Sequence, residues 1–518
     1  MKKALSIVLA VIMLFSLSTI AFAADYTPPF EKGTKDSDAF RIPAIYTLNN
    51  GSVIAAADMR YGHGSDSPNN IDSLIAISAN GYDNWKYTVL NHFDDYADGA
   101  TDVSSASFID MAVAQSSTGR IFVVVDAQPA NCGYLQCKKG TGYAYIDGEN
   151  RMLLTKGDNT DLDSFLYYIG DYKDGYAPIL SRSDGTETGY SVDTEFDLYK
   201  DGAAVLTQQK GTDETVYVNQ NVFYADSPFR CFMTTFLWMR YSDNNGDSWS
   251  EPVILTKEVK KDSEFFLGIC PGRGFVTKLA DGTERIIFTV YDNGVLGINT
   301  FENVSTIYSD DNGETWHRGA ETGCGLQVGK TSESQIVELN DGVLRMFARN
   351  NGNHIAYADS TDGGISWTDF ISDLSLSAHG NCMCSFIDTE IANKKAVIGS
   401  FASNNSYRAD GVIKVGFVES NNSINWVSTY ELPGQTYGAV KNFFAYSCIT
   451  ELSDGNYAIL YEDNASHLSY LIFSVDENGN IKEVNDNDPE PNTERNKLTF
   501  WQKLVNFFKN LFARLFNF

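Results

Sequence analysis

One eight-residue pattern recurs along this 518-residue chain and limits its fold more than any other feature. Its clearest copy is Ser309-Asp-Asp-Asn-Gly-Glu-Thr-Trp316; residues 242–249 and 360–367 are clear copies, and residues 78–85 and 420–426 are weaker ones. Asp or Asn beside Gly provides the hydrogen bonds and the positive φ angle of a tight hairpin turn, and the closing Trp is a large apolar anchor. We therefore interpret the pattern as a structural β-hairpin rather than a ligand site.

A second signal gives the size of the repeating unit. Short apolar runs that end in a turn stop at residues 51, 119, 282, 342, 393 and 455, so the intervals are 68, 163, 60, 51 and 62 residues. Periods near fifty with paired turns are typical of propeller blades made of antiparallel strands. The sequence predicts an all-β fold, a six-bladed β-propeller, with a small β-domain inserted in the one long interval.

Composition divides the chain into six segments. They are a signal peptide (1–23), the first part of the propeller (24–132), the inserted β-domain (133–222), the rest of the propeller (223–474), an acidic linker (475–496) and an amphipathic C-terminal helix (497–518). Lys2 and Lys3 precede an apolar run that closes with Ala21-Phe-Ala23, the pattern of a cleavable secretory signal. The run is short for a membrane span, so we expect a secreted or cell-surface protein.

The C-terminal segment differs in kind from the rest. Apolar residues between Trp501 and Phe516 recur at helical spacing, with Lys503, Lys509 and Arg514 on the other side. Such a helix is expected to lie on a membrane surface or to dock on a partner, and packing against the propeller is the alternative.

Charge and cysteines exclude several classes of function. The formal net charge is −28, which argues against nucleic acid as a partner. An anionic substrate would need a local positive field. Eight cysteines are too few for a disulfide scaffold, and no pair has zinc-like CxxC spacing, so the sequence predicts no metal in the site and leaves structural calcium open. Cys132 and Cys137 either form a bridge or act as small buried apolar residues.

Three arginines provide a candidate site for an anion. Arg41, Arg349 and Arg408 fall in different predicted blades, and the loops of a propeller converge at one end of its central channel. Three guanidinium groups around one point would bind a carboxylate strongly and supply the missing positive field.

Several motifs, in this order, resemble those of bacterial exo-sialidases of glycoside hydrolase family 33, particularly the large clostridial type with an inserted domain. They are Phe40-Arg-Ile-Pro43, the repeated turns known in that family as Asp boxes, Asp66-Ser-Pro-Asn-Asn70, a glutamate before a strand that ends in arginine, and Ala445-Tyr-Ser-Cys448. The resemblance covers about residues 40–474.

The resemblance implies a role for each matching residue. Asp66 would be the general acid/base, Tyr446 the nucleophile and Glu333 its assisting carboxylate; Arg41, Arg349 and Arg408 would bind the carboxylate of sialic acid, Arg60 would lie near the acid, Asp110 would contact the ligand, and Glu462 would orient Arg41. The implied activity is removal of terminal sialic acid from glycoproteins, glycolipids and oligosaccharides, with retention of configuration and without a cofactor.

The residues themselves agree with this implication. A sialoside carries its carboxylate on the anomeric carbon, so a carboxylate nucleophile would be repelled, whereas a tyrosine is neutral until a base takes its proton. Two alternatives remain open on the sequence: an intramolecular trans-sialidase that releases an anhydro-sugar, and a propeller that binds sialoglycans without catalysis.

Overall fold

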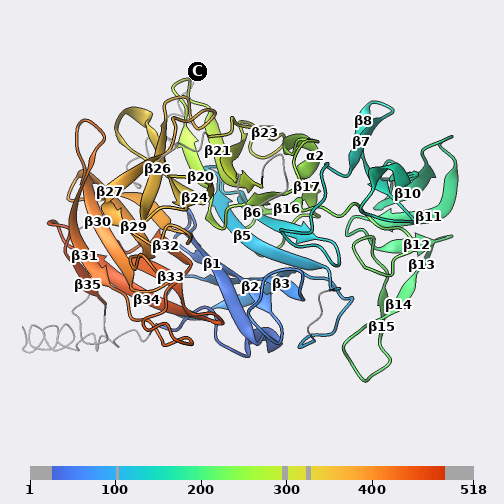
Figure 1. The fold of residues 1–518 in the computed structure, drawn as a ribbon, viewed down its shortest axis with the longest axis horizontal. Helices are drawn as coiled ribbons and strands as arrows, with labels where there is room; N and C mark the ends of the chain where they lie inside the picture. Colours follow the sequence, from blue (N-terminus) through green and yellow to red (C-terminus); the bar gives the residue numbers. More distant parts are fainter. Residues whose placement is uncertain (1–25, 101–103, 294–301, 323–327, 485–518) are drawn as a thin grey trace, which may run out of the picture.

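The structure is a computed structural model that describes residues 26–100, 104–293, 302–322 and 328–484. The predicted signal peptide and the predicted C-terminal helix lie outside these residues. Strands make up nearly all of the regular structure (Figure 1), and the predicted all-β class is confirmed. In the described ranges, the helical elements are α2 (Thr256–Val259) and the 3₁₀ turns Thr34–Asp36, Leu162–Ser164 and Asn340–Gly342. Among the described residues, no helix has the length and apolar character needed to cross a membrane.

Most strands form four-stranded antiparallel units. The first sheet contains β1 (Ala39–Thr47), β2 (Val53–Arg60), β3 (Ile71–Ser78), β4 (Lys86–Asn91), β5 (Ser107–Gln115), β6 (Ile121–Gln128), β16 (Phe236–Ser242), β17 (Val253–Ile254) and β19 (Gly272–Arg273). This sheet has two halves. The first half is β1 to β4, and the second is β5, β6, β16 and β17. The parallel pair of Ile71 in β3 with Ser107 in β5 joins them. The first half is a meander, and the second is interrupted by the long insertion between β6 and β16.

Four more sheets of the main body follow in chain order. One contains β18 (Leu267–Ile269), β20 (Phe275–Lys278), β21 (Glu284–Asp292), β22 (Asn303–Ser309) and β23 (His317–Arg318). The next contains β24 (Thr331–Glu338), β25 (Leu344–Asn350), β26 (His354–Ser360) and β27 (Ile371–Ser377). It is followed by the sheet of β28 (Ser385–Ile391), β29 (Lys394–Ala402), β30 (Gly411–Val418) and β31 (Ile424–Glu431). The last contains β32 (Ser447–Glu451), β33 (Tyr457–Asn464), β34 (His467–Val475) and β35 (Ile481–Glu483).

First strands of neighbouring units pack side by side. β1 contacts both β5 and β32, and β28 contacts both β24 and β32. Thr47 donates its backbone N–H to Oγ1 of Thr450 at 3.0 Å, which ties the first sheet to the last. These contacts place the first strands of successive units beside one another, the arrangement expected of a propeller. The count of six blades stays a prediction.

The eight-residue pattern forms hairpin turns, as its residue types predict. In residues 309–316, Ser309 Oγ accepts the Gly313 N–H at 2.8 Å, and Asp311 Oδ1 accepts the Thr315 N–H at 2.9 Å. Gly313 has φ +87°, and a Cβ there would meet the ring of Phe122 at 2.4 Å, so only glycine fits. Trp316 is 3% exposed and packs on Phe122. Residues 242–249 and 360–367 repeat the serine contact.

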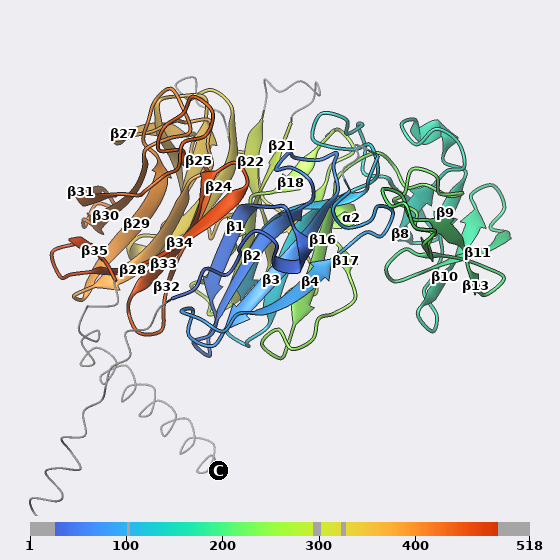
Figure 2. The ribbon, with the colours of Figure 1, turned by 90° about the horizontal axis from the view of Figure 1, so that it is seen from below.

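Residues between β6 and β16 form a separate sheet. Its order is β13 (Ala203–Ala204), β12 (Leu198–Lys200), β11 (Glu187–Asp193), β10 (Tyr176–Ser181), β9 (Tyr167–Ile169), β8 (Glu149–Leu154) and β7 (Tyr143–Ile146), beside a ribbon of β14 (Leu206–Gln208) and β15 (Tyr217–Asn219). It lies at one end of the molecule (Figures 1 and 2). Its core is not independent, because Phe196 and Phe223 pack on Trp238 of β16. This aromatic cluster joins the insertion to the main body, together with polar contacts such as the pair of Glu195 with Arg240.

Two further expectations can be compared with the structure. Residues 475–484, predicted as the start of the acidic linker, instead complete the last sheet, because β35 pairs with β34. The rest of the predicted linker lies outside the described residues. Asp476 accepts backbone N–H groups of Asn478 and Asn480, so the acidic, Asn-rich stretch is a hairpin turn at this point. Cys132 and Cys137 are buried free thiols whose sulfur atoms lie 3.6 Å apart.

Candidate active site

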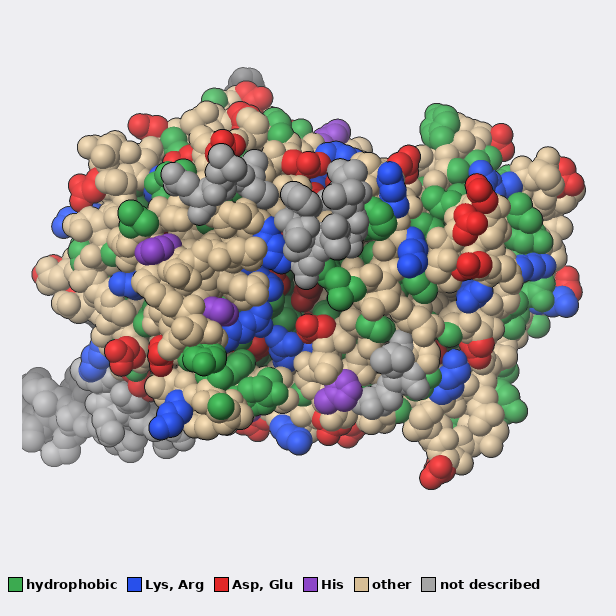
Figure 3. All heavy atoms as spheres, viewed as in Figure 1, with side chains coloured by type: hydrophobic (Ala, Val, Ile, Leu, Met, Phe, Trp, Pro, Cys, Tyr) green, Lys and Arg blue, Asp and Glu red, His purple; other side chains and the backbone are tan. Residues whose placement is uncertain are grey.

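A pocket of about 250 Å³ lies at the centre of the sheets, where loops and strand ends from several units meet. Its lining residues are Ile42, Asp66, Ser67, Ile109, Asp110, Asp126, Gln128, Tyr134, Phe266, Tyr291, Glu302, Lys330, Ser332, Glu333, Arg349, Asn381 and Tyr446. Figure 3 shows basic side chains gathered with acidic ones around a hollow near the middle of this face. None of the lining residues comes from β7 to β15, although Tyr134, in the segment between β6 and β7, contributes to the wall.

Tyr446, Glu333 and Arg349 form one hydrogen-bonded group. The Tyr446 hydroxyl donates to Glu333 Oε1 at 2.5 Å. Arg349 Nη1 donates to the Tyr446 oxygen at 2.9 Å and to Glu333 Oε2 at 2.6 Å. Burial and the Glu333 carboxylate raise the pKa of Tyr446 well above its usual value, while Arg349 and Arg408 oppose that rise. The free phenol is therefore protonated, and its proton already points at a base.

The three predicted arginines surround Tyr446. The guanidinium carbons of Arg41 and Arg408 lie 5.9 and 5.3 Å from the centre of the tyrosine ring, and Arg349 contacts its oxygen. Asn381 holds two of them: its Oδ1 accepts from Arg349 at 2.7 Å, and its backbone carbonyl accepts from Arg408 at 3.2 Å. The structure thus brings three positive groups around one buried hydroxyl, an arrangement suited to binding a carboxylate beside it.

The position of the Arg41 side chain is set by Glu462 and by a bulge in β1. The fully buried Glu462 accepts Arg41 Nε at 3.0 Å and Nη2 at 3.3 Å, and its Oε1 also accepts the Ile42 N–H at 3.0 Å. Ile42 has φ +56°, rare for a β-branched residue, and the register of β1 shifts between Arg41 and Ala44. Strained bulges of this kind cluster at functional sites, where they re-aim a side chain. Glu462 therefore holds the Arg41 side chain in place and also accepts the backbone N–H of the strained residue Ile42.

Arg60 connects Asp66 to the buried interior. Arg60 is fully buried and pairs with Asp58 at 2.7 Å and with Asp66 at 2.7 Å, and Arg41 reaches the same Asp66 oxygen at 3.0 Å. The Asp66 side chain is 66% exposed, so it lies at the rim with one side open to solvent. Burial of part of the group favours its neutral form, but Arg60 and Arg41 outweigh that effect and lower the pKa of Asp66 to about 2.

Two buried acids of the pocket, Asp110 and Asp126, have raised pKa values. Burial, reinforced by Asp58 and Glu333, raises the pKa of Asp110 well above its usual range, and burial does the same to Asp126. Asp110 has φ +64° at a bulge in β5 and donates its N–H to Asp58 at 3.0 Å. Asp126 Oδ2 and Gln128 Oε1 are buried without a hydrogen-bond partner in the described part of the chain. Both oxygens belong to residues that line the pocket, which leaves hydrogen-bonding capacity for a polar ligand.

Every predicted site residue lies in or beside this pocket, but the prediction missed several neighbours. Asn381 belongs to no motif, and the family resemblance implies no role for Asp58. At the rim, Tyr134 donates to Glu302 at 2.7 Å, and Lys330 reaches the same carboxylate oxygen at 3.0 Å. The residues that the prediction missed share one sequence feature: they are polar and lie at or near strand ends.

Two groups of side chains among the described residues have the spacing of metal ligands. Asp72, His92 and Asp98 form one, and Glu264, Asp292 and Glu321 the other, with ligand atoms within 4.8 Å of one another. None of these residues lines the central pocket. In the second group Arg318 lies 3.4 Å from Glu264 and 3.6 Å from Asp292, so a side-chain cation already compensates the carboxylates.

Comparisons with known proteins agree with this geometry. The model of the BNR repeat-like domain family matches residues 198–459. The anhydrosialidase of Macrobdella decora is 30% identical over 462 residues, which cover 82% of this chain and 58% of that protein. Sialidase B of Streptococcus pneumoniae is 28% identical over 497 residues, which cover 89% and 67%. The chain thus spans little more than half of the first relative and two thirds of the second.

One solved structure is matched over its whole length. The crystal structure of the intramolecular trans-sialidase from Ruminococcus gnavus in complex with oseltamivir carboxylate has a TM-score of 0.77 and 30% identity, and the match covers 89% of this chain and 100% of that one. The repeat-domain match, the sialidase relatives and this shared fold lead to one conclusion: the chain belongs to the family of BNR-repeat sialidases.

Proposed function

We propose that this protein is an exo-α-sialidase that releases terminal sialic acid from glycans through a covalent tyrosyl intermediate, with Tyr446 as nucleophile. The observation that carries the proposal is the 2.5 Å hydrogen bond from Tyr446 to Glu333 inside a ring of three arginines. The arginines hold the substrate carboxylate, and the carboxylate sets the anomeric carbon close to the tyrosine oxygen. A six-bladed propeller that gathers these residues at its centre is part of the same proposal.

Glu333 makes the tyrosine a nucleophile. An unperturbed tyrosine has a pKa of about 10 and is a poor nucleophile at neutral pH. Here the proton passes to Glu333 as the tyrosine oxygen attacks. Arg349 Nη1 lies 2.9 Å from that oxygen and 2.6 Å from Glu333 Oε2, so it stabilises negative charge on either group during the transfer. The neutral phenol avoids the repulsion that a carboxylate nucleophile would meet from the carboxylate of the substrate.

Asp66 supplies and later removes a proton. In the free protein Arg60 and Arg41 keep this group ionised, with a pKa of about 2. When the substrate carboxylate engages Arg41, it neutralises part of that field and excludes water, and both changes raise the pKa of Asp66 in the complex. The protonated acid then protonates the leaving oxygen, and its conjugate base activates water in the second step, so configuration is retained.

Replacing Asp66 with alanine tests this role. On 3′-sialyllactose, whose leaving group needs a proton, kcat should fall by roughly 10²- to 10⁴-fold. On an activated aryl sialoside the loss in kcat/KM, which reports formation of the intermediate, should be small, since the phenolate leaves without a proton. The side chain is 66% exposed, so the fold should survive, and circular dichroism provides that control. Equal losses on both substrates would remove Asp66 from the acid role.

A second candidate function differs only in the last step. The relatives include an anhydrosialidase, an intramolecular trans-sialidase, and a leech intramolecular trans-sialidase described as complexed with 2,7-anhydro-Neu5Ac. In that reaction a hydroxyl of the sugar's own glycerol chain attacks the intermediate in place of water. Formation of the Tyr446 intermediate is common to both reactions.

The product decides between the two functions. Mass analysis of the sugar released from 3′-sialyllactose should give free sialic acid if water completes the reaction. A product lighter by one water would establish the intramolecular reaction. For the hydrolase, NMR should show the first-formed anomer with retained configuration before it mutarotates, and an inverted anomer would contradict the two-step mechanism.

A further inference from the structure

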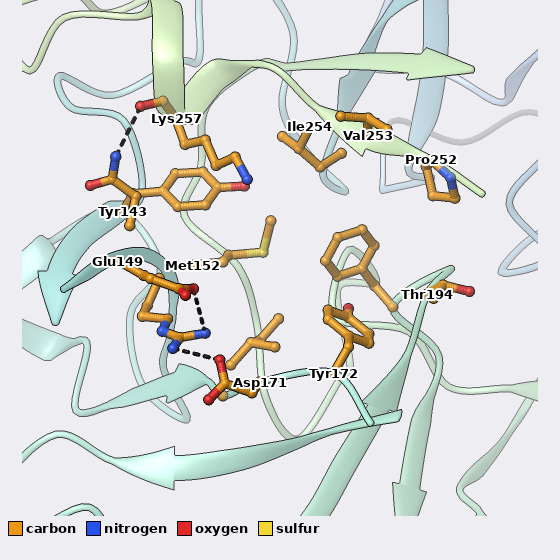
Figure 4. A pocket seen from close by; sticks show the side chains of 15 residues that line it. Tyr143, Glu149, Met152, Asp171, Tyr172, Thr194, Pro252, Val253, Ile254 and Lys257 are labelled. Atoms are coloured by element: carbon orange, nitrogen blue, oxygen red, sulfur yellow. Dashed lines mark hydrogen bonds and ion pairs between the residues drawn. The ribbon is translucent and has the colours of Figure 1, made fainter. Parts of the chain in front are cut away.

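A second pocket, of about 350 Å³, lies where the insertion meets β17 and α2 (Figure 4). It shares no lining residue with the central pocket. One side comes from β8, β9 and the loop after β9, and the other from Pro252 to Ile254 and Lys257. Its volume falls within the usual range for small-molecule sites, although nothing in the proposed reaction uses it.

The walls of this pocket are apolar and aromatic. Met152, Ile169, Phe196 and Ile254 are all buried and form an apolar floor. Tyr172 is 45% exposed, yet its hydroxyl donates to the Asp193 carbonyl at 3.1 Å, which holds the ring in place. An aromatic ring held open to solvent by its own hydrogen bond needs little ordering when a ligand binds to it.

The rim is polar but electrically balanced. Arg151 pairs with Asp171 at 2.7 Å and with Glu149 at 3.2 Å, and its Nε is buried without a partner among the described residues. Lys257 adds a second positive charge, so two cations face two carboxylates (Figure 4). The four charged lining residues therefore offer donors and acceptors side by side and carry no net charge among them, unlike the three arginines of the central pocket. This balance suits a neutral ligand rich in hydroxyl groups.

We propose that this pocket is an accessory site for a neutral pyranose, such as the galactose to which sialic acid is attached in many glycans. A pyranose has an apolar C–H face, which matches the ring of Tyr172 and the apolar floor, and a hydroxyl edge, which matches the balanced rim. The choice of a glycan sugar rests on the proposed sialidase function. A weak second contact would raise the effective concentration of branched substrates at the central pocket.

Binding of lactose to the full-length protein tests the proposal by saturation-transfer NMR. Lactose should receive saturation from the unaltered protein and from Tyr172→Phe, which keeps the ring. Tyr172→Ala should weaken binding by at least about tenfold, since stacking on an aromatic ring is lost. Tyr145→Ala is the matched control: this exposed tyrosine of the same sheet does not line the pocket, so lactose binding should stay unchanged.

Kinetics provide a second measurement. Tyr172→Ala should leave kcat/KM on an aryl sialoside unchanged and raise KM several-fold on a glycoprotein with branched sialylated chains. Lactose binding should persist when free sialic acid fills the central pocket, which separates this site from the proposed catalytic one. If the protein bound lactose at this pocket but had no sialidase activity, the proposed function would be wrong and the accessory site would stand. No lactose binding, equal binding by Tyr172→Ala, or preferential binding of sialic acid at this pocket would overturn the accessory site.

Discussion

Replacing Tyr446 with phenylalanine should lower kcat by roughly 10³-fold or more on every sialoside, including activated aryl substrates. The change deletes one oxygen, the atom that attacks the anomeric carbon. Glu333 and Arg349 keep their direct contact at 2.6 Å, so no buried charge loses its partner. KM should change little, because the arginines that hold the substrate carboxylate remain. Steady-state kinetics on 3′-sialyllactose and on an aryl sialoside measure both parameters.

Tyr457→Phe is the matched control for this substitution. Tyr457 is also a fully buried tyrosine, its hydroxyl lies 3.0 Å from that of Thr389, and it does not line the central pocket. Loss of that hydrogen bond should cost about 1 kcal/mol of stability and leave kcat unchanged. If Tyr446→Phe turned over substrate like the unaltered protein, another group would be the nucleophile.

Replacing Arg349 with alanine should reduce kcat/KM by roughly 10²- to 10³-fold or more, and it should affect both kcat and KM. Arg349 contacts Glu333 and the Tyr446 oxygen and opposes the rise in the tyrosine pKa. Without it, the buried Glu333 carboxylate loses its cation and the phenol holds its proton more tightly. The substrate carboxylate also loses one of three positive partners.

Arg408→Ala should act differently. The structure gives Arg408 a contact with the Asn381 carbonyl and a position over the Tyr446 ring, so its loss should raise KM more than it lowers kcat. Arg345→Ala is the control, because Arg345 lies on the same strand as Arg349 but pairs with Asp359 away from the pocket. Unchanged kcat and KM in a folded Arg408→Ala protein would remove that arginine from the site.

The sequence identified residues that the structure brings together at the central pocket, but it did not identify the residues that support them. Arg41, Asp66 and Tyr446 lie in short motifs with specific spacing, so matching motifs was enough to find them. Asn381 and Asp58 support these residues through contacts between distant parts of the chain, and no local pattern marks such contacts. The positive φ of Ile42 could not be predicted either, because a β-branched residue gives no local reason for it.

For the fold, too, local features could be predicted from the sequence, whereas contacts between distant parts of the chain could not. Turn chemistry is local, so the Ser-to-Trp hairpins and the all-β class could be predicted from Asp, Asn and Gly. The packing of Phe196 and Phe223 on Trp238, which joins the insertion to the main body, depends on tertiary contacts. The misplaced linker boundary at residue 475 has a similar origin, because Asp476 and Gly479 fit either a linker or a hairpin until β34 and β35 are seen to pair.

Trapping the covalent intermediate tests the central claim most directly. A 2,3-difluorinated sialic acid carries a fluoride that leaves readily from the anomeric carbon, and its second fluorine slows breakdown of the glycosyl-enzyme. Digestion and mass spectrometry should then place the added sugar on the peptide that contains Tyr446, and Tyr446→Phe should show no adduct there. An adduct on Asp66, Asp110 or Glu333, or inactivation without any adduct at Tyr446, would contradict the tyrosyl mechanism.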